Sequence, residues 1–212
     1  MTLDAATIAG MAAQIAPAIP AALFVAIAKK ESGNDPSEVD VYATGVRVPA
    51  DEIDWSDSGK KYTVGLFQCS SAELRAYSGN AAGYVAALQD PSLNLLVYAH
   101  ALTTLYIPEV RSRGWDGASA DGWAFVALGH NMGLARLREK LTLIGGVDWP
   151  AFVERYQGRK LDSGYDASRW VRYGQAVIDA IGDPEATTDD ETELDPLAVA
   201  AIIGGFLLWR LT

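Results

Sequence analysis

An abrupt change of side-chain chemistry near residue 183 divides this chain into a large body and a distinct C-terminal part. Asp183–Asp195 contains seven acidic residues and no Lys or Arg, a composition typical of a solvated linker. Directly after it, Leu197–Trp209 is a run of 13 residues without a polar side chain. We therefore expect a globular body at 1–182, an acidic linker at 183–195 and an apolar C-terminal helix at 196–212.

The apolar segment leaves three interpretations open. As a helix rising about 1.5 Å per residue it would span about 20 Å, short of the roughly 30 Å hydrocarbon core of a bilayer. Trp209 and Arg210 at its end are typical of interface anchors, and small residues four apart favour close helix–helix contact. The segment is a membrane anchor, a docking segment for a protein assembly, or a helix that packs on its own body.

Composition excludes several function classes. Half of the 212 residues are hydrophobic, so the body can bury a real core. The net charge of −10 provides no global basic field, which argues against a nucleic-acid partner. One cysteine excludes an internal disulfide and, with only two histidines, argues against a metal site. We expect neither metal nor cofactor.

Capping residues and apolar periodicity predict a mainly α single domain. Ser70-Ser-Ala-Glu73 has the pattern of a capping box, and Asp90-Pro91 that of an N-cap followed by a first-turn proline. Helices are expected at 5–15, 20–32, from Ser70, 93–106, 121–130, 134–143, 148–156 and 166–181. Strand patterns are weak, and Tyr42–Val48 with Tyr62–Phe67 is expected to form a short β-hairpin.

The second helix carries the first chemical signal. Phe24, Ile27, Ala28 and Glu31 follow one another at i, i+3, i+4 and i+7, so a carboxylate continues an apolar stripe. It lies near the negative end of the helix dipole, and both desolvation and the dipole penalise its charged form. We expect a raised pKa for Glu31, which is what a general acid needs; a surface Glu in the last turn is the alternative.

Four short motifs, in this order along residues 20–180, resemble those of soluble lytic transglycosylases and goose-type lysozymes. They are Glu31-Ser-Gly-Asn-Asp-Pro36, Gly65-Leu-Phe-Gln68, Asp90-Pro91 with Asn94, and Ala127-Leu-Gly-His-Asn131-Met-Gly133. Trp170-Val171 is similar to a late Y-V pair of that family. The resemblance covers most of the body and none of the tail.

This resemblance implies a lysozyme-like fold whose groove binds the glycan strands of peptidoglycan. Glu31 falls on the family's catalytic acid, which protonates the β-1,4 oxygen between N-acetylmuramic acid and N-acetylglucosamine and then deprotonates the muramic C6 hydroxyl, leaving a 1,6-anhydro end. Gln68 and Asn131 would bind acetamido groups or orient Glu31, and Ser32 and Gly65 would shape the groove.

Three departures from the family pattern qualify this expectation. Asn34 stands where the family usually has an aromatic residue, and His130 replaces a tyrosine that lies near the catalytic Glu, so His130 either takes over that role or weakens the site. The link 37–64 is longer than usual and contains an acid-rich set: Glu38, Asp40, Asp51, Glu52, Asp54 and Asp57.

The insertion leaves a second reaction open. An inverting muramidase needs another carboxylate about 6.5–9.5 Å from the first, and one of the acids in 38–57 could supply it. Alternatively these acids form a solvated loop, with Trp55 placed to stack on a sugar ring. A different class of hypothesis is a catalytically inactive glycan-binding or scaffold module.

Delivery to a cell wall needs an explanation, because Met1–Asp4 lacks a basic region and Pro17 and Pro20 interrupt the apolar run that follows. We favour a phage virion component carried to the bacterial wall over a membrane-anchored periplasmic protein. Cys69, next to the Gly65–Gln68 motif, is expected to be buried and inert.

Overall fold

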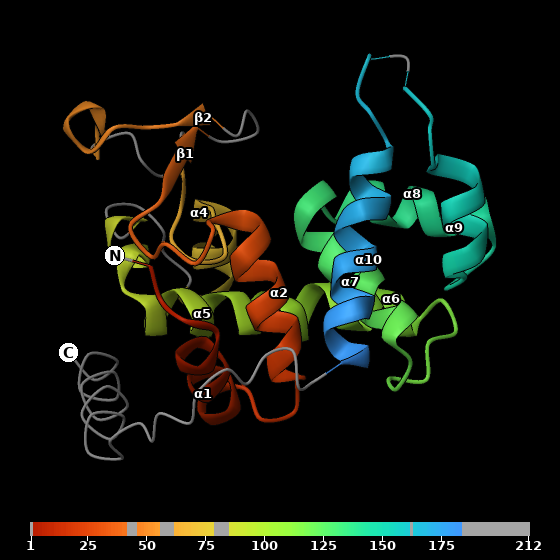
Figure 1. Ribbon diagram of the computed structural model, residues 1–212, viewed down its shortest axis with the longest axis horizontal. Helices are drawn as coiled ribbons and strands as arrows, with labels where there is room; N and C mark the ends of the chain where they lie inside the picture. Colours follow the sequence, from red (N-terminus) through yellow and green to blue (C-terminus); the bar gives the residue numbers. More distant parts are fainter. Residues whose placement is uncertain (1, 42–45, 56–61, 79–84, 162, 184–212) are drawn as a thin grey trace.

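A computed structural model describes residues 2–41, 46–55, 62–78, 85–161 and 163–183. This part of the chain is mainly helical and carries a small three-stranded sheet (Figure 1). The predicted tail at 196–212, nearly all of the predicted acidic linker and Asp57 lie outside the described residues. Within them, no helix has both the length and the apolar character that crossing a membrane requires.

The first two helices begin and end close to the predicted residues. Helix α1 spans Ala5–Ile15 and is capped by Asp4, whose carboxylate accepts a 2.7 Å hydrogen bond from the Thr7 amide. Helix α2 spans Ala21–Glu31 and follows Pro20. They pack against each other, which brings the N-terminus to the loop after α2, where the Leu3 amide donates to the Asn34 carbonyl at 2.8 Å.

A set of buried helices forms the centre of the molecule. Helix α5 (Pro91–Ala101) continues through a π-helical turn (Leu102–Tyr106) into α6 (Ile107–Arg111). Helix α7 (Ala120–Met132) is apolar nearly all round and buried along most of its length, as a helix enclosed by others must be. Helix α10 (Ser168–Gly182) packs on α7 and on α2, so the end of the described chain is joined to its beginning.

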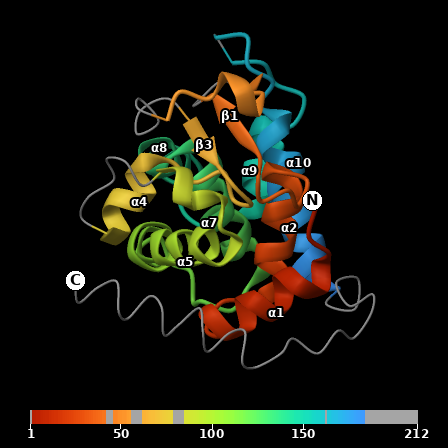
Figure 2. The same ribbon diagram turned by 90° about the vertical axis from the view of Figure 1, so that its left-hand side faces the viewer.

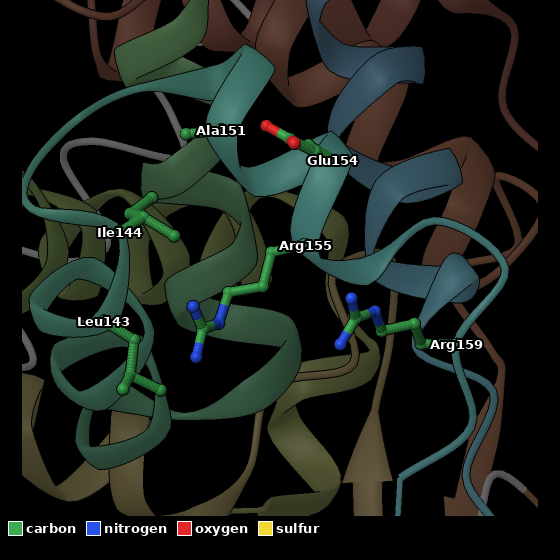
Figure 3. Close-up of a pocket in the computed structure, with 6 residues that line it drawn as sticks. All are labelled: Leu143, Ile144, Ala151, Glu154, Arg155 and Arg159. Atoms are coloured by element: carbon green, nitrogen blue, oxygen red, sulfur yellow. The ribbon is translucent and has the colours of Figure 1, made fainter.

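Three further helices complete the fold. They are α4 (Ser71–Ser78), α8 (Leu134–Ile144) and α9 (Trp149–Tyr156), with 3₁₀ turns at Ala50–Glu52 and Val85–Gln89. Trp115, Trp123 and Trp149 are buried. Residues of α8 and α9, with Arg159, line a cavity of about 410 Å³ (Figure 3).

The sheet corrects the predicted hairpin. Strands β1 (Val39–Val41), β2 (Val46–Arg47) and β3 (Tyr62–Val64) are antiparallel in the order β2-β1-β3, so the two predicted segments pair with β1 and not with each other. Buried Val39 lies opposite buried Val64, which gives the central strand its apolar contact. Beyond Val64 the chain turns sharply instead of remaining extended. Figures 1 and 2 both show the sheet at the end of the molecule opposite α1.

Candidate functional site

Glu31 is the last residue of α2 and is half-buried. Phe24, Ile27 and Ala28, which precede it on the same stripe, are fully buried, while Lys29 and Lys30 are exposed. Gly33 and Asn34 then take left-handed φ values of 63° and 67°, so the chain leaves the helix at once. The carboxyl group is therefore held at the margin of the core.

A tyrosine from the other end of the body contacts this carboxyl group. The Tyr173 hydroxyl, from α10, donates a 2.5 Å hydrogen bond to Oε1 of Glu31. Burial raises the pKa of the Tyr173 phenol well above its ordinary value, and the neighbouring Glu31 carboxylate raises it further. Tyr173 thus remains a hydrogen-bond donor throughout the physiological pH range.

An aromatic cluster lies beside Glu31 and supports the following turn. The rings of Phe67 and Tyr98 stack with centroids 4.7 Å apart, and Phe24 meets both edge-on at 5.8 and 6.1 Å. Burial, and then the charge of Glu31, raise the pKa of Tyr98 well above its ordinary value. The Tyr98 hydroxyl is buried and forms no hydrogen bond among the described residues.

His130 belongs to the same cluster and forms a buried ion pair. Its ring meets Tyr98 edge-on at 4.8 Å, and Nδ1 lies 3.6 Å from Oε1 of Glu73, the capping-box residue of α4. Burial opposes the charge of both groups, but their mutual attraction outweighs it. The attraction of His130 and the hydrogen bonds from Ser70 together lower the pKa of Glu73 to about 2. The carboxylates of Glu73 and Glu31 and the Phe67 backbone raise the pKa of His130.

The Gly65–Gln68 segment is a tight turn fixed by a buried asparagine. The Asn94 side chain donates to the carbonyls of Val64 (2.8 Å) and Leu88 (2.9 Å) and accepts from the Phe67 amide at 2.9 Å. Gly65 has a φ of 80°, and a Cβ there would lie 2.3 Å from the Leu88 carbonyl oxygen. Gly65 and Asn94 both belong to the motifs on which the family resemblance depends. The structure shows that the turn itself requires them.

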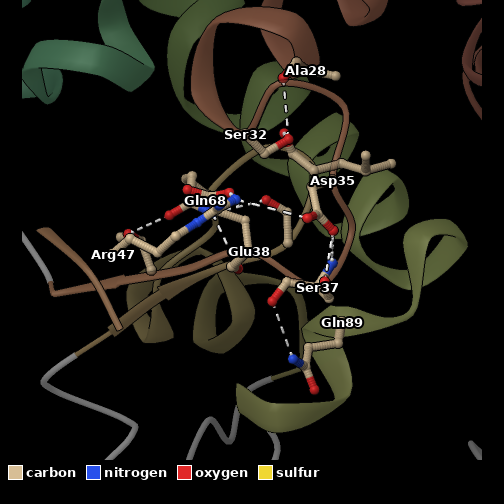
Figure 4. A network of polar contacts seen from close by, with 11 residues as sticks. Ala28, Ser32, Asp35, Ser37, Glu38, Arg47, Gln68 and Gln89 are labelled. Carbon is tan, nitrogen blue, oxygen red and sulfur yellow. Dashed lines mark hydrogen bonds and ion pairs between the residues drawn. The ribbon is translucent and has the colours of Figure 1, made fainter. Parts of the chain in front are cut away.

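Ser32 joins this turn to the end of α2. Its hydroxyl lies 3.1 Å from the Ala28 carbonyl oxygen and 3.0 Å from that of Leu66 (Figure 4). The residue directly after Glu31 thus binds the middle of the Gly65–Gln68 turn. Its role in the structure is to position the turn against the helix that carries Glu31.

Gln68 is held in place by the same loop. Its Nε2 donates to the carbonyls of Glu38 (3.2 Å) and Gly65 (3.0 Å), and its Oε1 accepts from the Thr63 hydroxyl at 2.8 Å. Both amide protons are used internally, so the structure gives Gln68 a turn-stabilising role, and binding of an acetamido group stays a prediction. Asn131, by contrast, is exposed at the end of α7.

The acidic insertion separates into three groups. Asp51, Glu52 and Asp54 are exposed. Glu38 forms an ion pair with Arg47, and the Arg47 guanidinium also lies 3.7 Å from the Asp35 carboxylate (Figure 4). Asp40, on the central strand, differs from these: burial, and then the charge of Glu31, raise its pKa above the ordinary value. Its buried Oδ1 forms no hydrogen bond within the described part of the chain. Asp40 is thus the carboxylate that is electrostatically coupled to Glu31.

Several residues of this site were missed by sequence reasoning. Tyr173 lies one helical turn beyond the singled-out Trp170, but its contact with Glu31 depends on α10 packing on α2. Glu73 was recognised only as a capping residue, and Tyr98 had no motif of its own. Trp55, the proposed sugar-stacking residue, is half-buried and meets Tyr62 edge-on at 6.1 Å.

One further reactive side chain, Cys69, directly follows the Gly65–Gln68 turn. Cys69 is buried, as predicted, and burial together with Glu73 and Glu31 raises its pKa well above the ordinary value, so it stays a thiol. No group of three metal-ligating side chains occurs among the residues that the structure describes. Comparison of the chain with protein-family models, curated proteins and solved structures finds no match in any of the three.

Proposed function

We propose that this protein is a peptidoglycan lytic transglycosylase in which Glu31 is the single acid and base. The observation that carries the proposal is the position of Glu31: a half-buried carboxyl group at a helix end, bound by Tyr173 and adjoining the turn that Asn94 and Ser32 fix. A fixed, partly desolvated carboxyl group is the requirement for protonating a glycosidic oxygen.

In the proposed reaction Glu31 first gives its proton to the oxygen that bridges the two sugars, and the bond from muramic C1 to that oxygen breaks. The resulting carboxylate stabilises the oxocarbenium-like centre at C1 and then accepts the proton of the muramic C6 hydroxyl as O6 bonds to C1. Glu31 ends in its starting state, and no water is consumed. Tyr173 keeps the carboxyl group in one orientation through both transfers.

The remaining proposed site residues serve substrate binding. Gly65 and Ser32 shape the groove through the turn, Gln68 stabilises that turn from within, and the exposed Asn131 offers its amide to the sugars. His130 contributes as the buried partner of Glu73 beneath this surface. We retain the proposal of a virion component delivered to the wall, with 196–212 as the anchoring or docking segment.

Digestion of purified murein sacculi tests this function. We expect fragments lighter than reducing muropeptides by the mass of one water, because the 1,6-anhydro bond replaces hydrolysis. The Glu31→Gln variant should release none while unfolding at the same temperature as the wild type. Full activity of that variant would assign the acid to another residue, and sacculus binding without cleavage by the wild type would favour the inactive module.

Asp40 favours a second candidate, an inverting muramidase. Two coupled carboxylates with separate protonation are what that reaction requires, one as acid and the other activating a water. The Asp40→Asn variant distinguishes the two. A transglycosylase would continue to form 1,6-anhydro products, whereas an inverting enzyme would form reducing products as wild type and lose nearly all activity in the variant.

A further inference from the structure

Residues 134–172 carry an electrostatic feature that the candidate site does not use. They contain eight Lys and Arg against five acids, whereas the chain as a whole has a net charge of −10. Helix α8, helix α9 and the first turn of α10 therefore form a basic region on an acidic protein. Such a separation of charge creates a surface that attracts anionic partners.

Three arginines of this region gather around one exposed tyrosine. Arg169 lies over the Tyr165 ring, 5.9 Å from its centroid, and Arg136 of α8 lines a cavity of about 160 Å³ together with Tyr165. Arg172 reaches Asp166, the residue after Tyr165, at 3.3 Å. Burial raises the pKa of the Tyr165 phenol, and the charges of all three arginines act in the opposite direction. We call Arg136, Arg169 and Arg172 the arginine cluster.

The arginine cluster has few internal partners. Arg136 and Arg169 are exposed, and neither guanidinium forms an ion pair or a hydrogen bond with a residue that the structure describes. Arg172 is exposed as well and pairs with one carboxylate, that of Asp166. Guanidinium groups form their strongest contacts with carboxylates, so the cluster can accept further acidic side chains.

The same chain supplies a matching partner directly after α10. Residues 183–195 contain seven acids and no Lys or Arg, and five of these acids lie within 189–195. The stretch 184–188, which precedes them, contains a single acid. The dense negative charge is thus separated from the end of α10 by a short spacer.

The length of this spacer fits the distance back to the arginine cluster. The cluster lies at the start of α10, and Asp183 follows the other end of that helix (Figure 1). Arg172 and Arg169 precede Asp183 by 11 and 14 residues, which is about 16 and 21 Å along a helix. Six extended residues, from 183 to 189, cover about 20 Å. A chain that reverses direction at Pro184 therefore brings 189–195 level with the cluster.

An exposed stripe of α10 provides the path for the returning chain. It consists of Arg169, Arg172, Gln175 and Asp179, which are all exposed and lie on one side of the helix. Asp179, which accepts a 2.8 Å hydrogen bond from Gln175, lies where the acid-poor spacer would pass. The two arginines lie where the acid-rich residues would pass. The order of charges along the stripe is therefore complementary to that of the segment.

We propose that residues 189–195 bind the arginine cluster of their own chain, so that the segment 183–195 returns along α10. Tethering favours this partner over a free anion, because a short linker gives the bound segment an effective concentration in the millimolar range. The apolar segment 196–212 then begins beside α8 and not at the far end of α10. The inference does not depend on the proposed enzymatic function.

Zero-length crosslinking of the full chain tests the contact. Arg169→Lys keeps the positive charge and supplies an amine, which a carbodiimide joins to a carboxylate in direct contact. We expect mass spectrometry to find position 169 joined to an acid of 189–195, at a yield about tenfold above that of Arg75→Lys, the control at an exposed position of α4. Equal yields, or no such crosslink, would overturn the proposal.

A mixture of isotopically heavy and light chains shows which copy supplies the acids. A crosslink within one chain joins two peptides of the same label, and a crosslink between two chains also joins peptides of different label. We expect matching labels only. Mixed labels would overturn the proposal and assign the contact to two copies of the chain.

Proteolysis measures the same contact without a crosslink. A glutamate-specific protease cuts within 189–195, and a bound segment is cut more slowly than a free one. We expect Arg136→Gln/Arg169→Gln/Arg172→Gln to be cut about tenfold faster than wild type at low salt, which corresponds to the loss of three exposed ion pairs. The difference should disappear in about 1 M salt, because exposed ion pairs are screened there.

A second triple variant controls for the change in net charge. Lys29→Gln/Lys30→Gln/Arg75→Gln removes three charges from other exposed positions and should be cut like wild type. Equal cutting rates in wild type and in both variants would overturn the proposal. Sedimentation of the wild type with anionic vesicles, lost in the arginine-cluster variant alone, would also overturn it and assign the cluster to a lipid surface.

Discussion

The Tyr173 hydroxyl donates a 2.5 Å hydrogen bond to Oε1 of Glu31, across 142 positions of the sequence. It joins α10 to the end of α2 at the point where the candidate acid leaves the core. This contact makes the orientation of the carboxyl group a consequence of helix packing and not of its own short segment.

Tyr173→Phe should therefore lower sacculus turnover about tenfold while the fold persists. Losing a hydrogen bond to a charged group costs about 1.5–3 kcal/mol, and about 1.4 kcal/mol in the barrier is a factor of ten in rate. Turnover and melting temperature are measured together. Tyr156→Phe is the control, since the buried Tyr156 hydroxyl has no hydrogen bond among the described residues. Unchanged turnover in Tyr173→Phe would show that the hydrogen bond between Tyr173 and Glu31 has no role in catalysis.

Asn94→Ala should destabilise the protein by about 3 kcal/mol, because it removes three buried hydrogen bonds that hold the Gly65–Gln68 turn. Denaturant unfolding measures the loss. Gln89→Ala removes one exposed 3.4 Å hydrogen bond to the Ser37 carbonyl and should be nearly neutral. Equal effects of the two substitutions would contradict the role assigned to Asn94.

Comparison of Gly65→Ala with Gly145→Ala separates the energetic cost of steric crowding from the cost of backbone strain. Both glycines have left-handed φ values, 80° and 84°, but a Cβ at 65 would lie 2.3 Å from the Leu88 carbonyl oxygen, while one at 145 meets nothing within 4 Å. We expect a cost of about 1 kcal/mol at 145 and more than about 3 kcal/mol at 65. Equal unfolding free energies for the two variants would show that the turn has room for a side chain.

The Glu73–His130 pair should make stability depend on pH. Glu73 has a pKa lowered from 4.5 to about 2, so its contribution to the free energy of unfolding is complete above about pH 4.5. This contribution is lost as the pH falls toward 2. His130 has a pKa raised from 6.5, so its contribution is complete below about pH 6.5 and is lost above its folded value.

Glu73→Gln should consequently destabilise most between about pH 4.5 and 6.5, by roughly 3 kcal/mol, with the difference from wild type narrowing toward pH 2. Unfolding free energies measured across this range test the expectation. Glu139→Gln removes an exposed carboxylate that pairs with Lys140 and should give only a small difference across the range. If the difference in unfolding free energy between Glu73→Gln and wild type did not change with pH, protonation of the Glu73–His130 pair would not be coupled to folding.

Local patterns predicted much of the helical structure. The Ser70–Glu73 box and Asp90-Pro91 mark helix starts because each satisfies backbone groups within a few residues, and the apolar stripe of α2 places Glu31 at the margin of the core. The short strands were less predictable, since β1 pairs with segments on both of its sides through contacts that periodicity does not encode.

The sequence by itself determined which side chain could be the acid, because a carboxylate on an apolar stripe can be recognised from spacing alone. Only the tertiary structure decided its neighbours. Tyr173, Asp40 and the His130–Glu73 pair come from α10, the sheet, α7 and α4, and they meet near Glu31 because these elements pack around α2 and α5. Long-range packing depends on the complementarity of whole surfaces, and no short motif records it.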